Sequence, residues 1–178
     1  DLRMICPDHG VIWRRDPSRI VQAYLEWCAQ QPQQKAVVVY DTMWHSTERM
    51  AEAIHAGITA EGVVSMPMNL RAYHRSEIMT EIFDARAVVV GSPTLNNGLF
   101  PTVADFLCYL RGLKPRHKIG AAFGSYGWSG EAVKLIEAEL KEMKIEPVEP
   151  GLRVQFVPEK PVIDQCREFG RRIGRAVK

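Results

Sequence analysis

Apolar runs of strand length alternate with helical patterns along most of the chain. The runs AVVVY (36–40) and AVVVG (87–91) are almost entirely apolar, which is typical of parallel strands that are covered on both faces. Between them, residues 47–60 repeat apolar side chains at the spacing of one helical face. Regular alternation of this kind predicts a parallel α/β sheet with helices on both faces.

The same pattern predicts five strand–helix units. The expected strands are residues 36–40, 63–70, 87–91, 118–124 and 152–157. The expected helices are residues 47–60, residues 76–84, a helix that begins at Pro101, residues 131–143 and a helix that begins at Pro161. Pro67 cannot donate to a sheet ladder, so we expect the strand 63–70 to lie at an edge. Ser76 is the expected N-cap of the second helix.

Residues 1–34 do not follow this alternation. The segment MICPDHGVIWRRDP predicts a strand, a loop and a short strand. Asp16 is the expected cap of a helix that starts at Pro17, and we expect the apolar face of this helix to be buried. That face consists of Ile20, Val21, Tyr24, Leu25 and Cys28. The polar stretch AQQPQQ (29–34) predicts a linker, so we expect the tail of another domain in residues 1–34 and an α/β domain in residues 35–178.

Composition narrows the function classes. The 178 residues are 46% hydrophobic and 25% charged, as in ordinary globular proteins. A net charge of +2 does not indicate nucleic-acid binding. The sequence contains no run of 18 apolar residues that would predict a membrane span. The four cysteines form no CxxC pattern, so we expect free thiols in a reducing cytoplasm. The chain opens on Asp1 and not on methionine, and we expect a fragment of a longer protein.

Three loops follow strands of the predicted sheet and are expected to meet at its carboxyl edge. The first, residues 41–47, opens a helix, so unpaired backbone N–H groups point out of it and suit a phosphate. The hydroxyls of Thr42, Ser46 and Thr47 can add hydrogen bonds. The loop lacks the lysine of a nucleotide-hydrolase P-loop, and no GxGxxG follows a strand. A phosphomonoester site and an ordinary capped helix are both compatible with this loop alone.

The second loop, SPTLNNGLFP (92–101), is rich in turn residues. Asn and Gly tolerate backbone shapes that bring main-chain groups close to a ligand, so the loop suits the polar edge of a planar heterocycle. A plain surface loop is the alternative. The third loop, GSYGWSG (124–130), places Tyr126 and Trp128 among glycines beyond a strand, which predicts a wall for a flat ring. Trp44 is either a second wall or a surface residue.

The first loop suits a phosphate, the second suits the polar edge of a heterocycle, and the third suits a flat ring. Together they predict flavin mononucleotide (FMN), which has one phosphate and a large flat ring. No residue of 35–178 is expected to be catalytic, because the redox chemistry belongs to the flavin. The candidate FMN-binding residues are Thr42, Met43, Trp44, His45, Ser46 and Thr47 in the first loop, Ser92, Pro93, Thr94, Leu95, Asn96 and Asn97 in the second, and Ser125, Tyr126, Gly127, Trp128, Ser129 and Gly130 in the third.

The loops also resemble those of a known family. The segments YDTMWHSTERMA, GSPTLNNGLFPT and FGSYGWSGEA resemble, in the same order, the flavin loops in the C-terminal domain of flavodiiron proteins, also called A-type flavoproteins. The resemblance implies a flavodoxin-like, doubly wound, five-stranded parallel sheet. Its expected strand order is 2-1-3-4-5, an order for which flavodoxins are themselves a standard example.

The N-terminal segment CPDHGVIWR resembles the end of the metallo-β-lactamase-like domain of that family. By position, the resemblance implies that His9 is a ligand of a diiron centre in the full-length protein. It further implies reduction of dioxygen or nitric oxide at that centre, with electrons that reach the FMN from a rubredoxin-type donor. Flavodiiron proteins are generally head-to-tail dimers, so a homodimer is implied as well. The other metal ligands of the family are absent from this chain, so we expect no assembled iron site in it.

Four other functions share this kind of sheet. A free-standing flavodoxin-type electron carrier and a flavodoxin-like quinone reductase remain as alternatives, although carriers of that type are usually strongly acidic. A phosphoacceptor receiver domain needs an acidic pair after the first strand and an aspartate after the third, whereas Asp41 stands alone and Ser92 takes the second place. A low-molecular-weight phosphatase needs Cys and Arg in residues 41–47, which contain neither.

Overall fold

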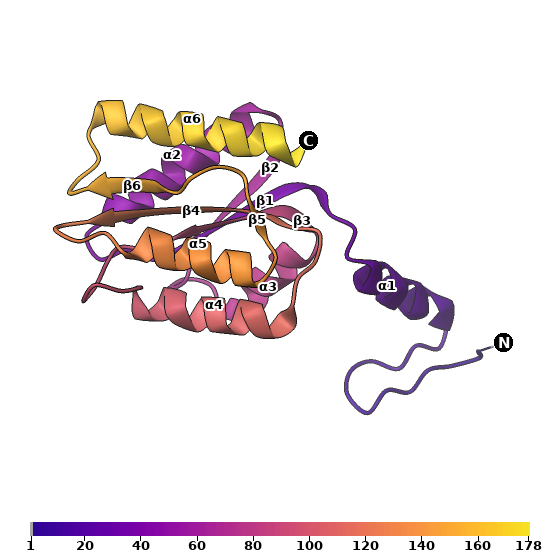
Figure 1. Ribbon diagram of the computed structural model, residues 1–178. Helices are drawn as coiled ribbons and strands as arrows, with labels where there is room; N and C mark the ends of the chain where they lie inside the picture. Colours follow the sequence, from indigo (N-terminus) through magenta and orange to yellow (C-terminus); the bar gives the residue numbers. More distant parts are fainter. Residues whose placement is uncertain (1) are drawn as a thin grey trace. The chain divides into compact units, whose positions relative to one another are not determined.

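The computed structural model describes residues 2–178, and the chain divides after Gln31 into two compact units. The larger unit is a parallel sheet between two layers of helices (Figure 1). Its strands are β1 (Gln33–Tyr40), β2 (Val64–Asn69), β3 (Ala85–Gly91), β4 (Ile119–Tyr126), β5 (Glu146–Pro147) and β6 (Leu152–Gln155). They are ordered β2-β1-β3-β4-β5, with β6 also paired to β4. The predicted flavodoxin-like order 2-1-3-4-5 is therefore confirmed.

The two faces of the sheet bury alternate residues of the same strands. In β1, Val38 belongs to the core under helices α2 (Ser46–Ala60) and α6 (Lys160–Val177). Val37 and Val39 belong to the opposite core, which is covered by α3 (Arg75–Phe83), α4 (Pro101–Leu113) and α5 (Ala132–Glu142). Both cores are apolar, which explains why β1 and β3 are continuously hydrophobic.

The fifth position of the sheet differs from the prediction of one strand over 152–157. It holds two short strands, β5 and β6, which pair in parallel with the beginning and the end of β4. Residues 148–151 separate the two strands, and Pro150 in this interval has no N–H with which to continue the ladder. At the other end, Phe156 has a left-handed φ of 61°, and the strand stops before it.

Two local predictions at β2 and α3 had different outcomes. The strand β2 pairs only with β1, so the edge position expected from Pro67 is confirmed. The prediction that Ser76 caps α3 is wrong. The imidazole of His74 accepts a hydrogen bond from the Ser76 N–H, and the Glu77 carboxylate accepts one from the His74 N–H. This reciprocal pair is a capping box at His74, and Ser76, two residues later, already lies inside the helix.

Helices α2 and α6 approach each other at backbone distance. A Cβ atom added to Gly57 would lie 2.0 Å from the carbonyl oxygen of Arg167, and one added to Gly170 would lie 2.1 Å from that of Ile54. Any side chain at these two positions would therefore collide with the partner helix. The glycines are required by this close approach.

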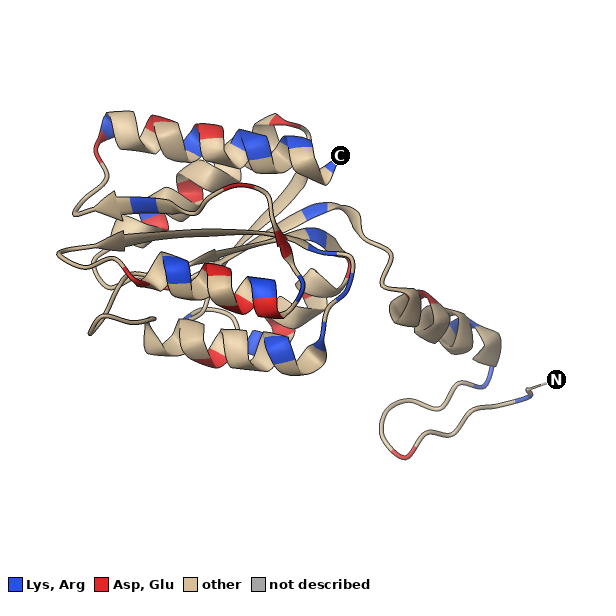
Figure 2. Ribbon diagram, viewed as in Figure 1, with Lys and Arg blue, Asp and Glu red and all other residues tan. Residues whose placement is uncertain are grey.

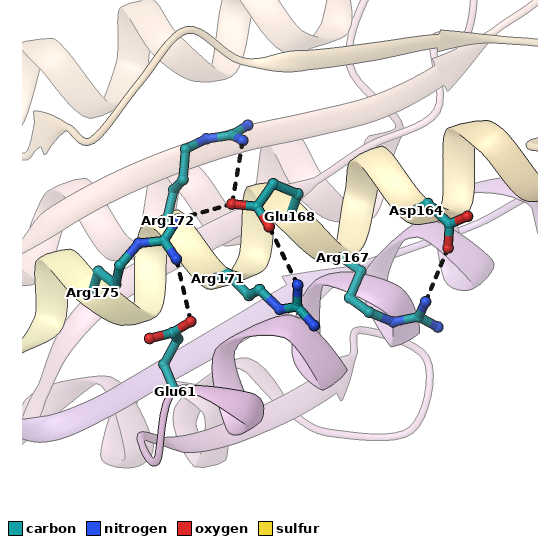
Figure 3. Close-up of polar contacts among 7 residues, drawn as sticks. All are labelled: Glu61, Asp164, Arg167, Glu168, Arg171, Arg172 and Arg175. Carbon is teal, nitrogen blue, oxygen red and sulfur yellow. Dashed lines mark hydrogen bonds and ion pairs between the residues drawn. The ribbon is translucent and has the colours of Figure 1, made fainter.

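The basic residues near the C-terminus are engaged in ion pairs on the surface of α6 (Figure 3). Arg175 contacts Glu61 at 3.3 Å and Glu168 at 2.8 Å, and Arg171 also reaches Glu168. The acidic residues Asp164 and Glu168 lie in the first half of this helix, whereas its charged residues from Arg171 onward are all arginines (Figure 2). These arginines are paired with Glu61, Glu149 and Glu168, so acidic and basic side chains are mixed at this exposed face.

The smaller unit contains a bridge between Ile5 and Trp13 and the helix α1 (Pro17–Ala29). The Asp16 carboxylate accepts a hydrogen bond from the Arg19 N–H, so its predicted capping role is confirmed. The predicted burial of the apolar face is wrong: Val21, Tyr24, Leu25 and Cys28 are exposed and Ile20 is only half-buried. This face of α1 is therefore largely exposed in the described residues.

The end of the predicted linker belongs to the sheet, because β1 already begins at Gln33, whose N–H bonds the Asp84 carbonyl at 2.7 Å. Within residues 2–178, no helix is long and apolar enough to cross a membrane.

Candidate functional site

The loops that follow β1, β3 and β4 converge on a hollow of about 360 Å³ at the carboxyl edge of the sheet. Parallel α/β sheets bind ligands at this edge. The hollow is lined by Met43, Trp44, Ser46, Pro93, Thr94, Ser125, Tyr126, Gly127, Phe156 and Val157. All but the last two belong to the loops predicted from the sequence, so the structure brings members of all three loops together.

The first loop ends in the N-terminus of α2, a helix of 15 residues. His45 is its N-cap residue and has a left-handed φ of 63°; its side chain makes no cap bond and pairs with Glu48 instead. The N–H groups of the first turn therefore remain available for a ligand, as a helix N-terminus provides. This geometry suits an anion without any lysine.

Two threonines of the first loop are buried at this point. Thr47 is fully buried, and its hydroxyl lies 2.9 Å from that of Ser125 at the end of β4. Thr42 is 5% exposed, and its hydroxyl oxygen is buried with no hydrogen-bond partner. Buried polar atoms are nearly always satisfied in folded proteins, so the Thr42 hydroxyl has the character of a ligand-binding group.

The second loop is a tight hairpin. Leu95 and Gly98 exchange backbone hydrogen bonds of 3.1 and 2.9 Å, and Asn96 and Asn97 form the turn with φ values of 49° and 58°. Two left-handed central residues are typical of the type I′ turn, which asparagine tolerates. Both asparagines are exposed at the tip.

Ser92 closes the base of the second loop. It is fully buried; its hydroxyl donates to the Pro93 carbonyl at 2.8 Å and accepts from the Phe100 N–H at 3.0 Å. The structure therefore gives Ser92 a role in holding the loop, and it does not line the hollow. Asn96 and Asn97 also lie outside the lining, at the hairpin tip.

The third loop carries the aromatic residues. Trp128 is 89% exposed, and Trp44 in the first loop is 84% exposed, so neither is a core residue. Tyr126 is half-buried as the last residue of β4, with the Arg153 guanidinium 5.4 Å from its ring centre. Gly130 has a φ of +81°, and a Cβ atom there would lie 3.0 Å from the Tyr126 ring. The glycine thus allows the chain to turn closely around Tyr126.

Phe156 and Val157 complete the hollow and were not among the predicted site residues. Both are exposed, Phe156 by 65%. They directly follow β6 and so reach the same carboxyl edge as the other three loops. The predicted strand over 152–157 places both residues inside the sheet, so the sequence pattern does not mark them as residues of a loop at this edge.

The residues present fit FMN. A buried, unpartnered hydroxyl and a helix N-terminus provide neutral donors for a phosphate. The exposed side chains of Trp44 and Phe156 line the hollow and suit a flat ring, whereas Thr42 and Trp128 are not part of its lining. Burial, followed by the nearby charge of Glu48, raises the pKa of Tyr40 at the end of β1.

Metal ligands do not gather anywhere in the part of the chain that the structure describes. No group of three or more His, Cys, Asp or Glu side chains among residues 2–178 could hold a metal ion. His9 is exposed in the smaller unit. Its role as an iron ligand remains a prediction for a full-length protein.

A protein-family model described as flavodoxin matches residues 38–170. The chain belongs to the flavodoxin family. The match starts inside β1 and ends inside α6, so it includes all three loops of the site.

Relatives of known activity extend this similarity to nearly the whole chain. A nitric oxide reductase from Moorella thermoacetica is 48% identical over 99% of the chain. The structure of the rubredoxin oxygen:oxidoreductase from Desulfovibrio gigas superposes with a TM-score of 0.95 and 45% identity over 98% of the chain. A flavodiiron protein from Giardia intestinalis superposes with a TM-score of 0.94 and 32% identity over 99%. The chain spans 44% of each of these proteins. The resemblance to flavodiiron proteins is therefore confirmed.

Proposed function

We propose that this chain binds one FMN in the hollow at the carboxyl edge of the sheet and serves as an electron-transfer domain. The observation that carries this proposal is the buried, unpartnered hydroxyl of Thr42 beside the N-terminus of α2. Membership of the flavodoxin family supports the same ligand. When bound, FMN accepts and donates electrons, while the protein binds it, orients it and limits the access of water.

The three loops divide the work of binding. Thr42, Ser46 and Thr47, together with the backbone of Met43, Trp44 and His45, hold the phosphate. The second loop binds the polar edge of the ring through Pro93, Thr94, Leu95, Asn96 and Asn97. Ser92 holds the base of this loop in place. Tyr126 and Trp128 pack against the ring. They lie on a turn that also contains Gly127, Ser129 and Gly130.

In a full-length protein, the domain would pass electrons to a diiron centre that reduces dioxygen or nitric oxide. The names of its relatives support this role, because they include a nitric oxide reductase, a rubredoxin oxygen:oxidoreductase and a flavodiiron protein. A rubredoxin-type protein is the proposed electron donor, and the diiron domain of a second copy, in a cytoplasmic head-to-tail homodimer, is the proposed acceptor. His9 is the proposed iron ligand.

A free-standing flavodoxin-type carrier or a quinone reductase would need only the larger unit. The similarity to the flavodiiron protein covers 99% of the chain, and so it includes the smaller unit as well. This coverage favours the flavodiiron role. An electron carrier that acts alone would show no dependence on residues 2–31.

The cofactor can be tested directly. The purified protein is expected to be yellow, and heating is expected to release one FMN per chain that co-migrates with an authentic standard in chromatography. The sequence has one loop suited to a phosphate, residues 41–47, and no second glycine-rich loop for an adenine dinucleotide. Release of the dinucleotide form, or of no flavin after incubation with FMN, would reject the proposal.

A further inference from the structure

Asp41 follows β1 directly, and its side chain is fully buried. Oδ1 accepts a hydrogen bond of 2.6 Å from the Thr42 N–H and forms an ion pair with Arg71, whose Nε lies 2.8 Å away. Oδ2 accepts a bond of 2.5 Å from the Thr102 hydroxyl. The carboxylate therefore joins the first loop, the turn after β2 and the first turn of α4.

These contacts determine how Thr42 is held. The backbone N–H of Thr42 is bonded to its neighbour's carboxylate, and the residue is 5% exposed. Its hydroxyl is nevertheless left without a partner. A buried hydroxyl without a hydrogen bond lowers the stability of the fold. We therefore interpret this hydroxyl as held in place for a hydrogen-bonding partner from outside the chain.

The charge of Asp41 would oppose a phosphate unless it were compensated. Residues 41–47 contain no lysine or arginine, and a phosphate monoester carries a charge of about −1.5 to −2 at neutral pH. Arg71 supplies the compensation through its ion pair with Oδ1. Its guanidinium also lies 5.6 Å from the centre of the Phe100 ring, which helps to hold it beside the carboxylate.

We infer that Asp41 is a positioning residue that acts through Thr42 and gives the site its preference for a phosphorylated flavin over riboflavin, with Arg71 neutralising the carboxylate. This inference rests on the proposed function. Asp41 does not need to touch the flavin, because it acts by fixing the backbone and the hydroxyl of Thr42.

The test compares two ligands that differ only in the phosphate. Flavin-free wild-type protein and variants are titrated with FMN and with riboflavin, and binding is followed by quenching of flavin fluorescence. Asp41→Ala is expected to weaken FMN binding by about tenfold or more, the range of one lost hydrogen bond to a charged group. Riboflavin binding is expected to change by less than about twofold. Asp41→Asn retains the Oδ1 acceptor and is expected to restore most of the FMN affinity.

A double-mutant cycle tests whether Asp41 acts through Thr42. Thr42→Val removes the hydroxyl at nearly constant volume and is expected to cause a similar FMN-selective loss. Adding Asp41→Ala to Thr42→Val is then expected to weaken FMN binding little further. If Asp41→Ala does not fold, Thr102→Val, which removes the donor to Oδ2, is expected to produce a smaller FMN-selective loss.

Asp105→Ala is the matched control, because it breaks an exposed aspartate–arginine pair with Arg75 (2.8 Å) and is expected to leave both affinities unchanged. Equal losses for FMN and riboflavin in Asp41→Ala, or additive losses with Thr42→Val, would overturn the inference. Wild-type protein that binds both flavins equally would overturn it as well. Wild-type protein that binds neither flavin would instead reject the proposed function.

Discussion

The hydroxyl oxygens of Thr47 and Ser125 lie 2.9 Å apart in the interior of the protein. Thr47 is in the first turn of α2, and Ser125 is near the end of β4, 78 positions further along the chain. Their hydrogen bond therefore joins the first and third loops of the proposed FMN site. Each hydroxyl has one donor and two acceptor positions, so the bond leaves capacity for a ligand.

Thr47→Ala is expected to weaken FMN binding while the fold survives. A lost hydrogen bond to a phosphate is charge-assisted and contributes about 1.5–3 kcal/mol, which corresponds to roughly a tenfold to hundredfold loss of affinity. Titration of the flavin-free variant with FMN measures this loss. Thr80→Ala is a suitable control, because the exposed Thr80 hydroxyl donates to the Ser76 carbonyl within α3. Unchanged FMN affinity in Thr47→Ala would show that the phosphate lies elsewhere.

Trp128→Ala is expected to shift the reduction potentials of the bound flavin more than Thr47→Ala does. The indole is 89% exposed in the absence of a ligand, and stacking on the ring would exclude water from the reduced, more electron-rich state. Removing an exposed side chain is expected to leave the melting temperature of the flavin-free protein unchanged. Unshifted potentials together with a large loss of stability would contradict the proposed stacking.

We expect this chain alone to bind no stoichiometric diiron centre and to reduce neither dioxygen nor nitric oxide at an enzymatic rate. His9 is the only residue in this chain that the family resemblance marks as an iron ligand, and a single imidazole cannot hold two metal ions. Elemental analysis after incubation with ferrous iron tests the first statement. Two irons per chain, or rapid turnover with a chemical reductant, would contradict this prediction.

Lys118 makes the stability of the fold depend on pH. The side chain is 4% exposed, and its ammonium donates hydrogen bonds to the carbonyls of Phe83 (2.9 Å) and Ala85 (2.6 Å). Burial lowers its pKa from 10.5 to about 8. The folded state therefore releases this proton more readily than the unfolded state, and this contribution to the free energy of unfolding rises as the pH increases above 8.

The size of this effect is about 3 kcal/mol between pH 8 and 10.5, taking about 1.36 kcal/mol for each pKa unit. Tyr40 and Lys35 have raised pKa values and act in the opposite direction, but only from about pH 10 upward. Urea denaturation between pH 7.5 and 9.5 is therefore the most informative measurement. Lys118→Met is expected to flatten the rise in stability, and an equal slope in variant and wild type would exclude Lys118 as its source.

The sequence predicted the sheet well because its central strands are unambiguous. The run AVVVY is apolar on both faces, and the core of the structure uses both faces of β1. The short strand β5 could not be predicted, because Glu146 and Pro147 show neither an apolar run nor alternation. Its place is determined by the neighbouring strand β4, which no local pattern reveals.

The positions of the loops could be predicted better than the roles of single residues. Strand ends place the loops at one edge, and this rule is general for parallel sheets. Whether a residue such as Ser92 faces the hollow or the loop's own backbone depends on hydrogen bonds formed only in the folded chain. Similarly, helical spacing shows that α1 has an apolar face, but spacing alone does not show what covers that face.

The glycine contacts between α2 and α6 determine where the site can adapt. With Gly57 and Gly170 at backbone distance from the opposite helix, α2 cannot rotate or slide without a collision. The N-terminus of α2 is then a rigid anion-binding site that needs little ordering when a phosphate binds. The entropy lost on binding is therefore smaller there. Adjustment to different flavins must come from the hairpin at Asn96 and Asn97 and from the turn at Trp128. Substitutions there would tune ring specificity without altering phosphate capture.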